Sequence, residues 1–103
     1  MSTFLKNVKL DLTSTGVTTL YTTPAAKTAV FKSILVSEDS GNADTITVTI
    51  TDASAAVFSL FKVKAVAANT TVELLSQPLV VETSEILKFT AATANRLHVV
   101  ASY

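Results

Sequence analysis

The only histidine of this 103-residue chain, His98, is the residue best suited to acid–base chemistry. An imidazole can act as a general base toward a serine when an aspartate orients the ring. In one large class of hydrolases such a serine is presented by a Gly-x-Ser-x-Gly turn, but the sequence holds only Gly16 and Gly41. His98 stands between Leu97 and Val99 in a strand-like segment, where a structural or interface role is more common. We therefore expect a protein that is not an enzyme and that has no catalytic residue.

Four polar residues in one loop could offer oxygen ligands to calcium, namely Glu38, Asp39, Asn42 and Asp44. Their spacing departs from that of the EF-hand loop, and no closing bidentate glutamate follows them. Short polar side chains in loops also form hydrogen bonds with their own backbone. We expect a solvated loop here and no metal site.

Carbohydrate binding would need exposed aromatic rings, and the chain has no Trp. Tyr21 and Tyr103 could stack on a glycan, but tyrosines at interfaces more often bury the ring and keep the hydroxyl in water. Two glycines cannot form a Gly-rich phosphate loop, and Lys and Arg do not cluster with aromatic residues. We expect no cofactor and no nucleic-acid partner.

The composition points to a surface that is partly covered by other protein. Hydrophobic residues make up 49% of the chain and charged residues only 16%, against about 25% in an average protein. Eight basic residues balance eight acidic ones, so the chain lacks the positive field that nucleic acid or an anionic membrane attracts. Threonine replaces much of the missing charge, and its neutral hydroxyl can be buried against a neighbour at a lower desolvation cost than a charge.

The first ten residues do not form a secretion signal, because Lys6, Asn7 and Lys9 interrupt the apolar run. No stretch approaches the roughly 18 apolar residues of a membrane span. The absence of Cys excludes disulfides and thiolate metal sites. We expect a soluble protein that is made without secretion and has no membrane partner.

Alternation of apolar and polar residues dominates the chain and predicts β-strands. In residues 44–52 the apolar positions face one way and four threonines face the other. Residues 28–38 differ, because both faces are apolar, with Val30, Ile34 and Val36 on one and Ala29, Phe31 and Leu35 on the other. We expect the second face of this strand to be covered by another element or subunit. The polar loop at 37–44 then predicts a β-hairpin that joins these two strands.

Residues 53–68 fit two interpretations. Ala56, Val57, Leu60 and Phe61 match a helical spacing, whereas the exchange of apolar residues between strand faces suits a long strand that bends at a bulge or changes sheet. We favour the strand. The other expected strands lie at 8–12, 17–22, 71–75, 79–82, 85–91 and 96–103.

About eight short strands separated by turns predict an all-β fold, an antiparallel β-sandwich that fills residues 1–103 as a single domain. Its wiring could be that of a jelly roll or of an immunoglobulin-like fold. The missing Cys and Trp argue only against an antibody-type domain.

One stretch of sequence, residues 20–36, resembles small virion structural proteins of tailed bacteriophages. In that group a strand that ends in Tyr-x-x-Pro, here Tyr21 to Pro24, leads into an apolar strand with Ser-Ile-x-Val, here Ser33 to Val36. A Thr- and Val-rich strand follows at 45–50. The later half of the chain is similar too, since a polar turn and strand at 69–74 precede strands at 79–81 and 85–87.

The resemblance implies a β-sandwich that adds to a virus particle assembled in the host cytoplasm. The leading expectation is a capsid decoration or cement protein that binds other virion proteins, foremost the major capsid protein. It would form a homo-oligomer, a trimer by analogy. The alternative is a neck, tail or fibre component that binds a receptor or glycan through loops 38–44 and 92–95. No catalytic residue is carried over.

The expected interface residues are side chains on the second face of the strands at 28–38 and 53–68, together with the single histidine and the two tyrosines. They are Tyr21, Phe31, Ser33, Leu35, Phe58, Leu60, His98 and Tyr103.

Overall fold

A computed structural model describes residues 6–103, and within them the chain forms ten β-strands and no helix. No membrane-spanning helix is therefore found among these residues. The strands are β1 (Asn7–Asp11), β2 (Thr18–Thr22), β3 (Ala29–Phe31), β4 (Ser33–Glu38), β5 (Asp44–Thr51), β6 (Val57–Val66), β7 (Thr71–Glu73), β8 (Leu79–Val81), β9 (Ile86–Ala91) and β10 (Leu97–Ser102).

The strands pair as one long hairpin that is rolled up. β1 pairs with β10, β2 with β9, β3 with β8, β4 with β7 and β5 with β6, each time antiparallel. The turn between β5 and β6 is the tip of this hairpin. Rolling it up adds two further antiparallel pairs, β10 with β4 and β9 with β5. This strand connectivity is that of a jelly roll. Of the two topologies expected from the sequence, the jelly roll is therefore the one present.

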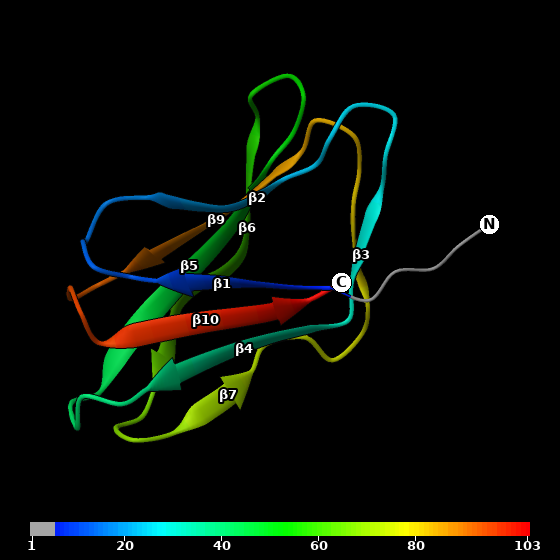
Figure 1. The fold of residues 1–103 in the computed structure, drawn as a ribbon. Coiled ribbons are helices and arrows are strands. Elements are labelled where there is room, and N and C mark those ends of the chain that lie inside the picture. Colours follow the sequence, from blue (N-terminus) through cyan, green and yellow to red (C-terminus); the bar gives the residue numbers. More distant parts are fainter. Residues whose placement is uncertain (1–5) are drawn as a thin grey trace.

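Two four-stranded sheets form the layers of the sandwich (Figure 1). One has the order β1-β10-β4-β7 and the other β2-β9-β5-β6, while β3 and β8 form a short third pair. Alternate residues of each strand point between the layers, as the period-2 pattern predicts. The largest fully buried side chains are Phe31, Phe89, Leu12, Ile34, Ile46, Leu87 and Leu97. The expected all-β antiparallel sandwich is confirmed.

Ten strands are found where about eight were expected. The segments expected as strands, with the favoured one at 53–68 (now β6), number nine, and the tenth arises because 28–38 is two strands, β3 and β4. The favoured interpretation of 53–68 is therefore confirmed. The pairing of β6 with β5 shifts register twice, so the expected bulge is present in this strand.

The break at Lys32 corrects the expectation of a strand with two apolar faces. Ala29 and Phe31 point inward from β3, and after Lys32 the phase changes so that Ile34 and Val36 point inward from β4. The change occurs because β3 pairs with β8 whereas β4 pairs with β10 and β7. Four of the six apolar residues therefore reach the same core.

The prediction of a hairpin between 28–38 and 44–52 is wrong. β4 and β5 belong to different sheets, so the loop at 39–43 crosses from one layer to the other. The partners of β4 are β7 and β10, which are distant in sequence, and the alternation of residues within a strand does not identify its neighbour.

Candidate interaction surface

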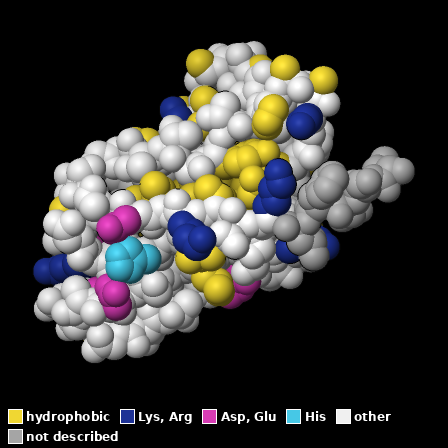
Figure 2. Space-filling model, viewed as in Figure 1, with side chains coloured by type: hydrophobic (Ala, Val, Ile, Leu, Met, Phe, Trp, Pro, Cys, Tyr) yellow, Lys and Arg dark blue, Asp and Glu magenta, His cyan; other side chains and the backbone are white. Residues whose placement is uncertain are grey.

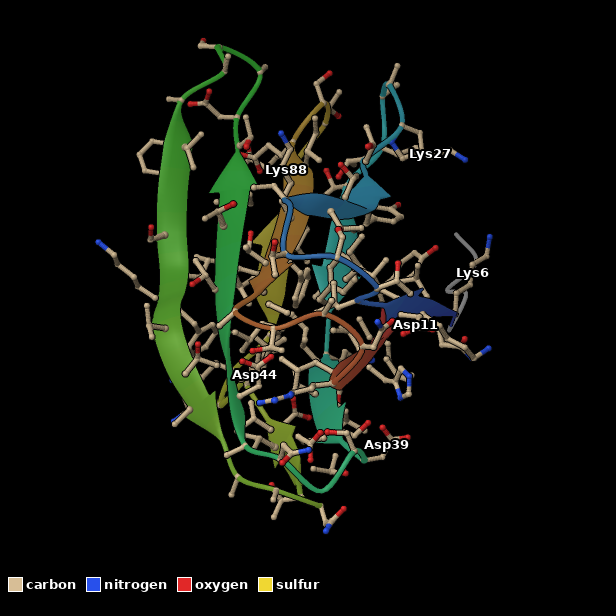
Figure 3. All side chains as sticks on the ribbon, turned by 90° about the vertical axis from the view of Figure 1, so that its left-hand side faces the viewer. Lys6, Asp11, Lys27, Asp39, Asp44 and Lys88 are labelled. Atoms are coloured by element: carbon tan, nitrogen blue, oxygen red, sulfur yellow. The ribbon has the colours of Figure 1, made fainter. Side chains whose placement is uncertain are left out.

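β6 is the ten-residue edge strand of its sheet and carries three of the eight exposed large apolar side chains in the described residues. The exposed fractions are 62% for Val57, 54% for Phe58 and 60% for Val63. We call the two adjacent residues Val57 and Phe58 the β6 patch. Figure 3 shows β6 as the outermost strand, with side chains that point away from the sandwich. A long apolar edge strand invites pairing with another chain, and proteins normally cover or disrupt such an edge.

The second half of β6 is disrupted in the way that protects an edge. The register shifts between Ile46 and Val48, opposite Lys62 and Val63. Val63 has a φ of 53°, a left-handed conformation that is strained for a β-branched residue. Its N–H donates to Thr47 Oγ1 at 3.1 Å, within its own sheet. With exposed Lys62 and Lys64 beside this bulge, the apolar first half of β6 is left as the available edge.

An apolar groove of about 220 Å³ opens beside the β6 patch, where the edges of the two sheets meet. Half-buried Leu60 and Phe61 form its β6 side. The segment that leads from β7 to β8 forms the other side, through Leu74, Leu75, Ser76, Gln77, Pro78 and Leu79. The groove extends the apolar surface of β6 toward the other sheet.

Two smaller apolar pairs lie elsewhere on the surface. Val30 and Val80 are partners across β3 and β8, and both are exposed. Leu35 and Val100 are partners across β4 and β10, and both are also exposed. On the adjoining strands, Leu35 pairs with Glu73 and Val100 pairs with Lys9. Charged side chains therefore flank this second pair.

His98 forms a bridge between two carboxylates. Its Nε2 lies 3.3 Å from Asp11 Oδ1, and its Nδ1 lies 3.4 Å from Asp39 Oδ2. Figure 2 shows the imidazole between two acidic side chains on the face formed by β1, β10 and β4. A neutral imidazole can donate from only one of its two nitrogens, and an imidazolium can donate from both. Because both nitrogens face carboxylates, neither is directed at a serine hydroxyl.

Glu38 ties two loops together at the end of the sandwich where β4 ends. Its buried Oε1 accepts hydrogen bonds from the N–H groups of Gly41 at 3.0 Å, Asn42 at 3.1 Å and Asn69 at 3.2 Å. Its Oε2 accepts from the N–H and the hydroxyl of Ser40. Burial alone would raise the pKa of Glu38, but the hydrogen bonds from Ser40, Asn69 and Gly41 outweigh it and lower the pKa to about 2.

The other acidic residues of this loop have separate protein partners. Asp39 faces His98, and Asp44 Oδ2 accepts a hydrogen bond from the N–H of Thr93 at 3.0 Å. Asp39 follows the end of β4, whereas Asp44 is the first residue of β5, and Figure 3 labels the two at separate places. Over residues 6–103 no group of three or more His, Cys, Asp or Glu side chains is placed to hold a metal ion.

Tyr21, Phe31 and Tyr103 form an aromatic cluster. The ring centroids of Tyr21 and Phe31 are 5.3 Å apart in an edge arrangement, and those of Tyr21 and Tyr103 are 4.8 Å apart. The Phe31 and Tyr103 centroids are separated by 5.0 Å. Desolvation by burial, with the neighbouring Tyr103 hydroxyl, raises the pKa of Tyr21. The rings pack on one another, which reduces the ring area that a sugar could contact.

The structure thus distributes the expected interface residues over four places. Phe31 is fully buried in the core, where no partner can reach it, and Tyr21 and Tyr103 are half-buried against it. Phe58 and Leu60 lie together on β6, but Leu35 lies on the other sheet. His98 is in its carboxylate bridge.

The eighth residue, Ser33, is engaged within its own sheet. Its hydroxyl donates to Glu73 Oε1, while Oε2 of the same carboxylate accepts from the N–H of Ile34 at 2.8 Å. Burial favours a higher pKa for Glu73, but these hydrogen bonds dominate and lower it.

Sequence reasoning did not select Val57 and Val63 as interface residues, nor Glu38 as the residue that orders two loops. The alternation of Lys62 and Lys64 with apolar residues was a signal of an edge strand. Nothing in the local sequence of Glu38 indicates that Asn69 lies beside it.

The chain matches no protein-family model, no curated protein and no solved structure.

Proposed function

We propose that this chain is a non-enzymatic structural protein of a tailed-phage virion, namely a capsid decoration or cement protein. The observation that carries the proposal is the β6 patch, because an exposed apolar edge strand is suited to permanent cover by a neighbouring subunit. The sequence resemblance supplies the virion setting, since a jelly roll by itself does not define a function.

Two further features support a role in which several sides of the molecule meet neighbours. The exposed pairs Val30–Val80 and Leu35–Val100 lie on strands other than β6. The outer face of the β5 sheet presents Thr45, Thr47 and Thr49, whose neutral side chains are half-buried. Many modest contacts of this kind become strong in a particle, because each contact raises the effective concentration for the next.

The partners in this proposal are other virion proteins, foremost the major capsid protein, and further copies of the chain. The resemblance implies a trimer of these copies, whereas the contact between β6 edges argued below predicts a dimer. The site of action is the virion, assembled in the host cytoplasm. A place in the neck, tail or fibre with a receptor- or glycan-binding role is the alternative.

An add-back experiment tests the proposal. Phage particles that lack this chain are mixed with the purified protein, and bound copies are counted by quantitative mass spectrometry of the washed particles. We expect many copies per particle and a higher temperature for release of the genome on heating. Binding at only a few sites would support the neck, tail or fibre alternative, and absence of binding would refute the virion role.

A further inference from the structure

The apolar first half of β6 has a pattern that is symmetric about one residue. Val57, Phe58, Ser59, Leu60 and Phe61 read apolar, apolar, small polar, apolar, apolar in both directions. When two copies of one strand pair antiparallel about a two-fold axis, every residue opposes a residue at the same distance on the other side of the axis. An axis at Ser59 therefore opposes Val57 to Phe61 and Phe58 to Leu60 of the second copy.

The charges next to this segment complement one another under the same symmetry. Continuing the register places Lys62 of one copy opposite Ala56 of the other and Lys64 opposite Ser54, both within the 52–56 turn that begins with Asp52. Asp52 uses Oδ1 to accept hydrogen bonds from the N–H groups of Ser54 and Ala56, both at 2.9 Å, so Oδ2 is available. Among residues 6–103, the ion pairs within 4.0 Å involve only His98, so neither lysine pairs with an acidic residue there.

The bulges limit how such a contact can form. Leu60 is the extra residue at one register shift, and Val63 lies at the other. A second copy can therefore add only a short stretch of main-chain pairing, and most of the affinity must come from side chains. Phe58 is suited to this role because aromatic residues dominate the centres of interfaces. Specific interfaces bury about 1,200–2,000 Å² in total, so the neighbouring groove at Leu60 and Phe61 must be covered too.

We propose that the β6 segment 57–61 is a self-association surface, at which a second copy of this chain packs antiparallel about a two-fold axis near Ser59, with Lys62 and Lys64 beside the 52–56 turn of the second copy, which contains Asp52. The proposal deepens the structural role inferred above by naming the contact between copies, and it rests on that role for its place in a particle.

Cysteine cross-linking of the purified, full-length chain tests the axis directly, because the natural sequence contains no Cys. Ser59→Cys places the two thiols opposite each other at the axis, close enough for a disulfide. Thr19→Cys is the matched control, since Thr19 is exposed on β2, at the opposite edge of the same sheet. Under mild oxidation we expect Ser59→Cys to form a covalent dimer at least ten times faster than Thr19→Cys.

Sedimentation velocity supplies the second measurement. We expect the unmodified chain to sediment as a dimer, Phe58→Lys to be monomeric, and Val80→Lys, which changes an exposed valine away from β6, to remain dimeric. Asp52→Asn retains the Oδ1 acceptor of the turn and should weaken the dimer several-fold at low salt.

A monomer, a trimer without preferential Ser59→Cys cross-linking, or association only with a different virion protein would overturn the two-fold assignment. These results are independent of the particle add-back experiment. A chain that binds particles but is monomeric refutes only the self-association surface, and a dimer that does not bind particles refutes only the virion role.

Discussion

Glu38 and Asn69 are 31 residues apart in sequence, yet Glu38 Oε1 accepts a hydrogen bond from the backbone N–H of Asn69 at 3.2 Å. The same carboxylate accepts from the loop that follows it, through Ser40, Gly41 and Asn42. One buried side chain therefore orders both the β4–β5 and the β6–β7 connections. These two loops lie together at one end of the sandwich (Figure 1).

Replacing this carboxylate should destabilise the fold. Glu38→Gln leaves a single oxygen acceptor and adds an NH₂ group that faces N–H donors, so several buried donors lose their partner. We expect a clear fall in the midpoint of urea unfolding followed by circular dichroism. Glu82→Gln, at an exposed glutamate, is the control and should leave the midpoint unchanged. Equal midpoints for both variants would contradict the role given to Glu38.

The pKa of Glu38 also predicts how stability depends on pH. The folded-state pKa is lowered from 4.5 to about 2, so the unfolded state binds the proton more readily. This contribution to stability is fully present above pH 4.5 and is lost as the pH falls toward 2. Glu73, whose pKa is also lowered, acts in the same direction. Urea unfolding at intervals between pH 6 and 2 should show a decline that is shallower in Glu38→Gln, and an identical slope would count against the assignment.

Two phenylalanines that look alike in sequence should respond differently to truncation. Phe31 is fully buried in the aromatic cluster, and Phe31→Ala should lower the free energy of unfolding by about 3–5 kcal/mol. Phe58 is exposed on β6, and Phe58→Ala should cost less than about 1 kcal/mol at a protein concentration low enough to keep the chain monomeric. Urea titrations of the two variants provide the comparison. A larger loss for Phe58 would mean that its side chain is buried within the monomer.

These two residues also show how far the sequence determines the fold. Alternation was sufficient to predict strands, a sandwich and most of the core, because one face of each strand must be buried. It could not reveal the phase change at Lys32. Phe31 and Ile34 both point into the core because β3 pairs with β8 whereas β4 pairs with β10, and both partner strands are distant in sequence. For the same reason residues 57–66 do not reveal which strand β6 pairs with, although Lys62 and Lys64 within them signal an edge strand.

The strained bulge at Val63 offers a substitution that should stabilise the chain. Asn tolerates the left-handed region better than a β-branched residue, and little apolar area is lost because Val63 is mostly exposed. We expect Val63→Asn to raise the free energy of unfolding by about 1 kcal/mol. Val80→Asn is the control, because Val80 is exposed without a positive φ, and it should be neutral or destabilising. Thermal unfolding of both proteins distinguishes them, and equal losses would show that Val63 is not strained.

The central claim is that neighbouring subunits cover the exposed apolar edge of this jelly roll in a virus particle. Electron cryo-microscopy of intact particles, with density assigned to this chain, tests it most directly. We predict copies at many symmetry-related positions on the particle, with Val57 and Phe58 buried against another subunit. Particles without density for the chain, or copies whose β6 edge faces solvent, would contradict the account.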